Sequence, residues 1–306
     1  MNLSPWQGQL AGRSPLDKID FKTITIIGLG LMGGSLALAL KRYGFQGEIV
    51  GVGRRVENLE KAQNRGIIDR YWTDPSKSVK DSDLVVLASH VGSFIGLTSS
   101  FKDFLKKGSI LTDLGSVKAN LVQELEAIVP DSVNYVGAHP IAGSERSGVE
   151  AAHEELYKGQ TCIITPTSLT DKNALQKVMR LWEFVGAKPV IMDSFEHDRL
   201  FGAISHLPHI AAYALVNTVV DFELESLSYS GRGFKDTTRI ALSPAELWID
   251  ICQYNKDNII ELIGLFEVYL TSIKKKLNES DWDGLKKEFL RARKERQKID
   301  CKPDYN

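Results

Sequence analysis

The stretch Gly28-Leu29-Gly30-Leu31-Met32-Gly33 decides the fold that we predict for this chain. It has the spacing G-x-G-x-x-G, follows the β-branched run Thr23–Ile27, and precedes a helical stretch over residues 35–43. In a dinucleotide-binding unit the first glycine allows the tight turn, the second lets the backbone approach a pyrophosphate, and the third lets helix and strand pack closely. The helix N-terminus then offers N–H groups and a positive dipole end to the phosphates. We therefore predict that these six residues bind a dinucleotide.

Beyond this turn, apolar strands alternate with helical stretches as far as residue 193. Such alternation predicts a doubly wound, mostly parallel sheet. After residue 193 the strand pattern stops. The fold class is therefore α/β, with an N-terminal arm (1–21), a Rossmann-type dinucleotide-binding domain (22–193) and an all-helical domain (194–306). We expect strands at 23–27, 48–52, 84–88, 109–113, 134–138, 161–165 and 188–192, and helices at 56–65, 120–128, 172–185, 195–222, 244–276 and 282–298.

Composition excludes several classes of partner. The 306 residues carry 38 basic and 39 acidic side chains, so no overall positive field attracts nucleic acid or an anionic membrane. The most apolar stretch, 204–220, is interrupted by two histidines, a proline and an asparagine, so we expect no transmembrane span. The three cysteines are scattered, which argues against disulfides and a zinc site and is typical of the reducing cytoplasm.

The end of the second strand decides between the two nicotinamide cofactors. An NAD site usually has Asp or Glu about 20 residues beyond the glycine turn, where it grips the ribose 2′-OH. Here Gly53 is followed by Arg54 and Arg55, and no acid stands at the strand end. A pair of guanidinium groups suits a 2′-phosphate. We therefore favour NADP, while solvated arginines would leave NAD open.

Four polar clusters lie beyond the cofactor motif. Two of them follow later strands, at 113–118 and 137–148, on the side where ligands bind in open α/β sheets. The other two, at 205–209 and 233–239, belong to the helical half. Together with the glycine turn, the motifs read GLGLMGGS, DLGSVK, GAHPIAGSERSGV, SHLPH and GFKDTTRIA. In this order they resemble the prephenate/arogenate dehydrogenase family of tyrosine biosynthesis, from about residue 22 to the C-terminus.

The resemblance implies oxidative decarboxylation of prephenate to 4-hydroxyphenylpyruvate with a nicotinamide cofactor. It makes His139 the base that accepts the hydroxyl proton, and a neutral imidazole suits this task at pH 7. It makes Ser116 a hydrogen-bonding partner that helps to orient the histidine. Arg239 resembles the clamp for a substrate carboxylate. The remaining residues implied for the substrate pocket are His206, His209, Ser144 and Glu145.

Several residues keep more than one interpretation. His206 and His209 have the spacing of a metal pair, but HxxH alone is weak, no other feature supports a metal, and one of them could be structural. Lys118 could be catalytic, although a lysine at a helix start is usually solvated. Ser89 and His90 stand where the family usually has proline. We expect both beside the cofactor, with His90 as a rival base or a hydrogen-bonding group.

Competing functions also remain. Arogenate carries an amino group in place of the side-chain keto group of prephenate, and His209 favours prephenate because arogenate-specific relatives often lack a histidine there. A β-hydroxyacid dehydrogenase would need a lysine on the interdomain helix, and residues 195–222 contain none. A non-catalytic NADP-binding sensor would bind the cofactor without turnover.

The helical half suggests how the chain associates. The apolar stripe Ile259, Leu262, Ile263, Phe266 and Leu270 offers more surface than one small domain covers. With the resemblance, it predicts a homodimer joined through the helical domains. We expect no regulatory module after residue 306, so any inhibition by tyrosine should act at the active site.

Overall fold

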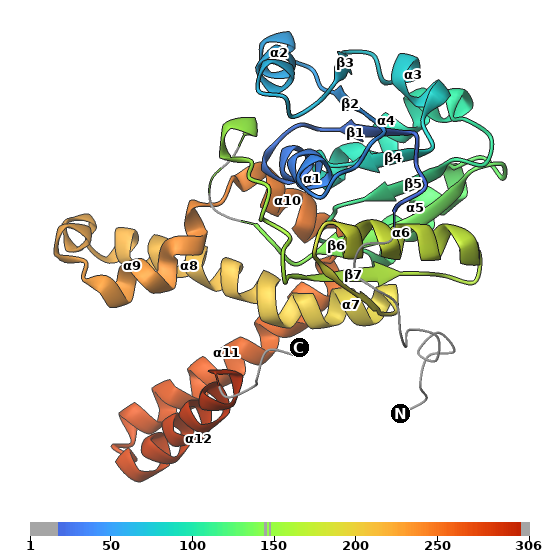
Figure 1. Cartoon of the computed structure of the whole chain (residues 1–306). Coiled ribbons are helices and arrows are strands. Elements are labelled where there is room, and N and C mark those ends of the chain that lie inside the picture. Colours follow the sequence, from blue (N-terminus) through green and yellow to red (C-terminus); the bar gives the residue numbers. More distant parts are fainter. Residues whose placement is uncertain (1–17, 144–145, 147, 301–306) are drawn as a thin grey trace. The chain divides into compact units, whose positions relative to one another are not determined.

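A single eight-stranded sheet organises the chain from Lys18 to the start of the helical region (Figure 1). The computed structural model describes residues 18–143, 146 and 148–300. All seven predicted strands are present, and β3 is an additional short edge strand that the sequence pattern did not reveal. The strands are β1 (Thr23–Ile27), β2 (Glu48–Val52), β3 (Arg70–Trp72), β4 (Leu84–Leu87), β5 (Ile110–Asp113), β6 (Asn134–Pro140), β7 (Thr161–Thr165) and β8 (Lys188–Ile191).

The strand order is β3-β2-β1-β4-β5-β6-β7-β8. All neighbours are parallel except β6 and β7, which pair antiparallel with His139 opposite Ile163. The chain order reverses at β1, because β2 lies on one side of it and β4 on the other. In doubly wound sheets such a switch point is where a crevice for ligands opens at the carboxyl ends of the strands. The predicted α/β fold class is confirmed.

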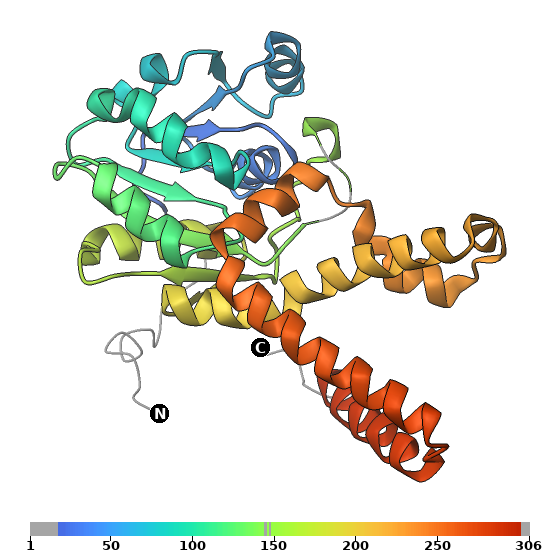
Figure 2. The ribbon, with the colours of Figure 1, turned by 180° about the vertical axis from the view of Figure 1, so that it is seen from behind.

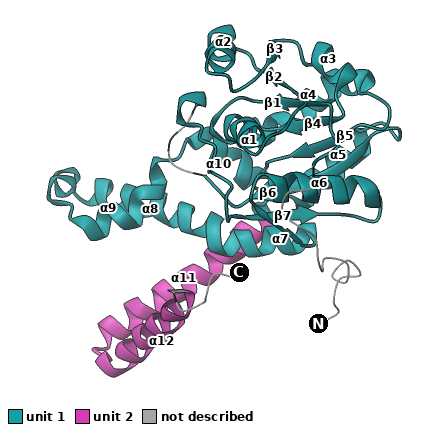
Figure 3. Ribbon diagram, viewed as in Figure 1, with its two compact units in different colours: residues 1–256 teal, residues 257–306 magenta. Residues whose placement is uncertain are grey.

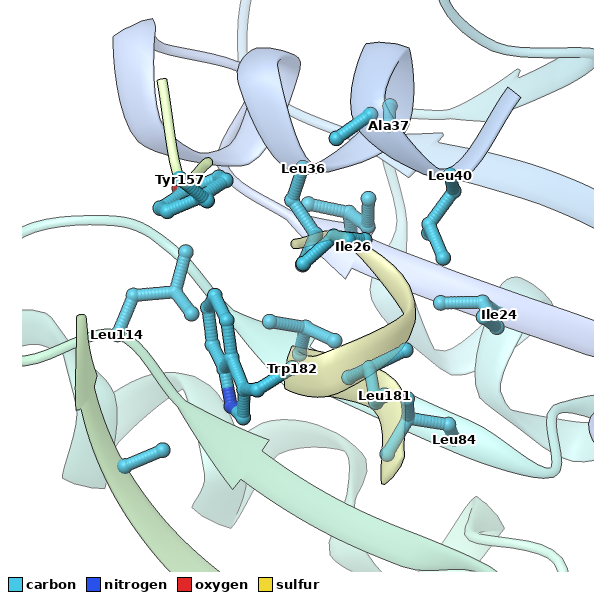
Figure 4. Packing of buried hydrophobic residues seen from close by; sticks show 14 of the residues in the cluster. Ile24, Ile26, Leu36, Ala37, Leu40, Leu84, Leu114, Tyr157, Leu181 and Trp182 are labelled. Atoms are coloured by element: carbon cyan, nitrogen blue, oxygen red, sulfur yellow. The ribbon is translucent and has the colours of Figure 1, made fainter. Parts of the chain in front are cut away.

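Helices cover both faces of the sheet. They are α1 (Leu31–Arg42), α2 (Val56–Asn64), α3 (Pro75–Ser78), α4 (Phe94–Phe101), α5 (Ala119–Ile128) and α6 (Lys172–Phe184). Because side chains alternate along a strand, Ile24 and Ile26 of β1 join one apolar cluster and Ile27 joins the other. Figure 4 shows the first cluster, where Trp182 of α6 and Leu36 of α1 meet at β1. Burial on both faces explains the near-continuous apolar runs of the central strands.

The chain beyond residue 193 is helical, as predicted, with a π-helical turn inside the helix over 194–222 and an interruption in the helix expected over 244–276. Pro208 near the start of α8 has no N–H to donate, and the turn before it, Gly202–His206, is π-helical. The helix expected over 244–276 is interrupted at Asn255, whose backbone is not helical. The helices are α7 (Ser194–Phe201), α8 (Leu207–Phe222), α9 (Arg232–Thr238), α10 (Ala245–Tyr254), α11 (Lys256–Asn278) and α12 (Trp282–Asp300).

Internal contacts divide the chain into two compact units, residues 1–256 and 257–306 (Figure 3). The first unit holds the sheet together with α7 to α10, and the second holds most of α11 together with α12. The boundary that we expected after residue 193 separates strand-bearing from helical sequence and stays a prediction. All described candidate site residues belong to the first unit.

The continuous helix over 194–222 is apolar and poorly covered. It is long and apolar enough to cross a membrane by length and composition, and 11% of its most apolar window is buried. Seen from behind, α8 runs out beyond the edge of the sheet (Figure 2). One such helix is weak evidence for a membrane span, and an apolar helix surface of this kind also fits a protein partner.

Candidate active site

The glycine turn is packed against the residues that follow β4. Gly28 has a positive φ of 107°, and its N–H donates to the carbonyl of Val52 at the end of β2. A Cβ on Gly28 would lie 2.7 Å from the backbone nitrogen of Ser89. The structure therefore brings together the turn and Ser89, two parts of the predicted cofactor site. His90 follows as an exposed residue.

Gly30 and the start of α1 form an open cradle. A Cβ on Gly30 would meet no atom within 4 Å, and no side chain caps the helix that begins at Leu31. At Gly33 a Cβ would lie 2.1 Å from the carbonyl oxygen of Gly28, so only glycine permits this close packing. Free N–H groups, open space and a helix N-terminus fit a pyrophosphate. The side chains of Leu29 and Leu31 pack into the core, so their backbone alone can face a dinucleotide.

The two arginines predicted to select the cofactor lie at the same edge of the sheet. Arg54 and Arg55 follow β2 directly and are exposed. Within the described residues, neither side chain has a hydrogen-bond or ion-pair partner. Glu48, at the other end of β2, pairs with Arg70 at 3.0 Å. Two exposed positive charges without a partner among the described residues therefore stand at the end of β2.

A buried charge pair lies beneath the second polar loop. Lys118 and Asp113 are fully buried, and the ammonium donates to Asp113 Oδ1 at 2.5 Å. The same carboxylate accepts from the hydroxyl of Tyr135 and the N–H of Gly115, both at 2.7 Å. Our expectation that Lys118 is solvated is therefore wrong: it folds inward because Asp113 compensates its charge where water does not reach.

His139 lies at the end of a chain of hydrogen bonds. Its Nδ1 is 2.7 Å from Nε2 of His197, and Nδ1 of His197 is 2.7 Å from Oδ1 of Asp198. Asp198 in turn accepts from the backbone N–H groups of Lys118 and Ala119 at 2.7 and 2.8 Å. Sequence analysis missed His197 and Asp198. The only signal was a His-Asp pair among helical residues, and nothing in that pattern showed that α7 turns it toward β6.

Burial controls the protonation of these imidazoles. It lowers the pKa of His139 well below its ordinary value, and the positive charge of Lys118 acts in the same direction. Burial also lowers the pKa of His197, although Asp198 acts in the opposite direction. The ring of Phe201 stacks on His197 at 4.5 Å and meets His139 edge-on at 5.0 Å. His139 is therefore neutral at pH 7, as a general base requires.

Ser116 presents a buried hydroxyl with no hydrogen-bond partner in the described structure. Ser116 lies on the loop that joins Asp113 to Lys118, the two residues of the buried ion pair. Buried hydroxyls are normally satisfied, so an orphan at this position fits a group that a ligand completes.

The two histidines of the 205–209 motif have different surroundings. His206 is buried and accepts from Nδ2 of Asn255 at 2.9 Å, which fits the structural interpretation. His209 is half-buried, donates from Nδ1 to the carbonyl of Ser205 at 2.9 Å, and stacks on Trp248 with 3.8 Å between ring centroids. Burial lowers the pKa of both imidazoles, that of His206 to about 4.

Arg239 belongs to the same neighbourhood. Besides burial, its positive charge lowers the pKa of His209, so the two side chains lie within electrostatic reach. Its guanidinium is exposed. His206 lies close enough to His139 to contribute to the lowered pKa of its imidazole. Ser144 and Glu145 lie outside the described residues. Within those residues, no group of three His, Cys, Asp or Glu side chains could hold a metal ion.

Comparisons with known proteins agree with the motif pattern. Residues 36–191 match the family model described as the nucleotide-binding domain of prephenate dehydrogenase, and residues 193–291 match the model of its dimerization domain. A cyclohexadienyl dehydrogenase of Zymomonas mobilis is 32% identical over 90% of this chain and 95% of its own length. A prephenate dehydrogenase of Bacillus subtilis is 34% identical over 89% of this chain and 74% of its own.

A solved structure is similar over nearly the same extent. It is the crystal structure of prephenate dehydrogenase from A. aeolicus in complex with hydroxyphenyl propionate and NAD+. It is 39% identical with a TM-score of 0.85, and the alignment covers 91% of this chain and 98% of that one.

Proposed function

The chain belongs to the prephenate dehydrogenase family, and from this premise we propose that it oxidises and decarboxylates prephenate to 4-hydroxyphenylpyruvate for tyrosine biosynthesis. The observation that carries the proposal is His139, a neutral imidazole at the end of β6 in contact with a buried His-Asp pair. A bound nicotinamide dinucleotide supplies the hydride acceptor for this reaction.

His139 takes the proton of the ring hydroxyl while hydride leaves the carbon that bears it. The ring carboxylate then departs as CO2, its bonding electrons aromatise the ring, and the resulting phenolate takes the proton back. The reaction thus consumes no net proton, and one side chain serves as base and then as acid. Ser116 would hydrogen-bond near the hydroxyl. Arg239 would bind a substrate carboxylate, with His209 and His206 on the helical side of the pocket and Ser144 and Glu145 on the loop after the base.

The test of the base is His139→Asn. We expect kcat to fall about 10²–10⁴-fold with both substrates saturating, because acid–base catalysis of this kind has that magnitude. A variant that keeps near wild-type kcat would show that another group is the base, with His90 as the first candidate.

A second substrate has specific support. The relative from Zymomonas mobilis is a cyclohexadienyl dehydrogenase, and arogenate differs from prephenate at a position remote from the reacting ring. A steady-state assay that crosses prephenate and arogenate with both dinucleotides separates these functions. Turnover of neither substrate would instead favour the sensor that binds NADP without catalysis.

For the cofactor we propose NADP over NAD, on the strength of Arg54 and Arg55. The glycine turn, Ser89 and His90 would contact the rest of the dinucleotide. We expect Arg54→Gln and Arg55→Gln each to lower kcat/KM for NADP at least 10-fold and to leave kcat/KM for NAD within twofold. Arg180→Gln, at an exposed position of α6, is the control. The complex of the A. aeolicus relative contains NAD+, so equal or better kcat/KM with NAD would reverse the preference.

We propose further that the protein is a cytoplasmic homodimer that acts on small molecules. The match to a dimerization domain and the poorly covered helices support the dimer. Cys162 and Cys252 are unpaired thiols, which is compatible with a reducing compartment. Inhibition by tyrosine, if it occurs, would act by competition at the substrate site, and initial rates at several tyrosine concentrations measure it.

A further inference from the structure

We infer that Asp198 and His197 are positioning residues that fix the tautomer of His139, so that its Nε2 is the atom that takes the substrate proton. This inference rests on the proposed function and adds two residues that the family motifs do not include.

Asp198 can only accept. Its Oδ1 and Oδ2 receive the N–H groups of Lys118 and Ala119, which open α5, and its side chain is 1% exposed. Two backbone donors and the positive end of a helix stabilise the ionised carboxylate. The contact of 2.7 Å between Asp198 Oδ1 and His197 Nδ1 therefore has the imidazole as its donor.

The direction of the next hydrogen bond follows. His197 is completely buried and neutral, because burial lowers the pKa of its imidazole. With a proton on Nδ1, its Nε2 carries a lone pair and accepts. His139 must then donate from its Nδ1 across the 2.7 Å contact, which leaves the lone pair on its own Nε2.

When His139 takes a proton, its imidazolium becomes positively charged. Among the charged groups around it, Asp198 is the one whose negative charge can stabilise this imidazolium. Lys118, before α5, and Asp113, after β5, neutralise each other at 2.5 Å. His206, on the π-helical turn, is neutral, with a pKa lowered to about 4 by burial. When His139 becomes an imidazolium, the chain through His197 connects it to the carboxylate of Asp198. Neither His197 nor Asp198 touches the reacting atoms in this arrangement.

The direct test is ¹⁵N NMR of the full-length protein with labelled histidine, at a pH where all imidazoles are neutral. His139→Asn identifies the signals of His139 among the six histidines. We expect a protonated Nδ1 and an unprotonated Nε2 in the wild type. In His197→Leu, which removes the acceptor, we expect the Nε2–H tautomer to become the major form. An Nε2–H tautomer of His139 in the wild type would overturn the inference whether or not His197→Leu folds.

Kinetics supply the second measurement. We expect His197→Leu to lower kcat at least 100-fold with KM for substrate and cofactor within twofold. His197→Gln keeps an acceptor for His139 Nδ1 and should recover at least tenfold of that loss. His153→Gln, at an exposed position, is the control and should match the wild type. Full kcat in His197→Leu would overturn this inference alone, whereas full kcat in His139→Asn would overturn the proposed base and this inference together.

Discussion

At the scale of single residues, we expect the hydroxyl of Ser116 to lower the stability of the free protein and to raise its activity. Its buried hydroxyl has no partner in the described structure, and an unsatisfied buried polar group costs about 1–3 kcal/mol. We expect Ser116→Ala to leave the free energy of unfolding unchanged or raise it by up to about 1 kcal/mol. We expect kcat/KM to fall about 10-fold, the size of one lost hydrogen bond to a reacting group.

The matched control is Ser109, which also carries a buried hydroxyl without a partner but precedes β5 at the opposite end of the strand. Ser109→Ala should give the same change in stability with unchanged kcat/KM. Urea denaturation and steady-state rates measure both quantities. Equal catalytic losses in the two variants would mean that Ser116 acts through packing and not through its hydroxyl.

At the scale of elements, the interruption between α10 and α11 places a side chain that connects three parts of the site. Asn255 ends α10 and turns its buried amide inward, where Nδ2 donates to the carbonyl of Asp198 on α7 and to Nδ1 of His206. This bond requires His206 to keep its lone pair. The hydrogen bonds of Asn255 therefore hold together α7, the π-helical turn and the end of α10. Protonation of His206 in acid would remove one of these bonds.

This contact predicts how stability depends on pH. The folded-state pKa of His206 is about 4, below the ordinary value of 6.5, so the neutral form is favoured in the folded protein. Stability from this group is fully present above pH 6.5 and is lost as pH falls toward 4, by at most about 3 kcal/mol. Burial of His139 and His197 acts in the same direction.

Urea denaturation at pH 7, 5.5 and 4.5 measures this effect. His206→Asn keeps an acceptor near the position of Nδ1 and removes the titration, so we expect a shallower loss of unfolding free energy with acid. His153→Gln should behave as the wild type because its imidazole is exposed. A slope in His206→Asn as steep as in the wild type would assign the acid sensitivity to other groups.

At the scale of the whole molecule, the second unit exposes more apolar surface than an isolated helical hairpin tolerates. On α11, Leu265 is 54% exposed and Val268 is 63% exposed, and they lie on one helix face three residues apart. We expect light scattering after gel filtration to give twice the chain mass of 34.0 kDa at micromolar concentration.

The double variant Leu265→Glu/Val268→Glu should shift this mass toward that of the monomer, because buried unpaired carboxylates are costly at an interface. Lys274→Glu, an exposed charge reversal on the same helix, is the control. A wild-type protein that elutes as a monomer would contradict the proposed homodimer.

The sequence by itself determined the fold class, seven of the eight strands and the glycine turn. These depend on local rules: β-branched runs make buried strands, and the roles of Gly28, Gly30 and Gly33 follow from the absence of a Cβ. It also singled out His139 and Ser116 through the motifs. It did not reveal β3, whose three residues are too few to show a pattern, the π-helical turn before Pro208, or the interruption at Asn255.

Only the tertiary structure decided what surrounds the base. Lys118 is buried because Asp113 at the end of β5 accepts a hydrogen bond from its ammonium, while Tyr135 of β6 holds the same carboxylate. His197 is functional in our proposal because α7 turns it toward β6. A pattern along the chain does not show which side chains meet in space. His139 and His197, for example, lie 58 residues apart in the sequence. The physical reason is that a hydrogen bond depends on distance in space, which the packing of α7 against the sheet domain alone sets.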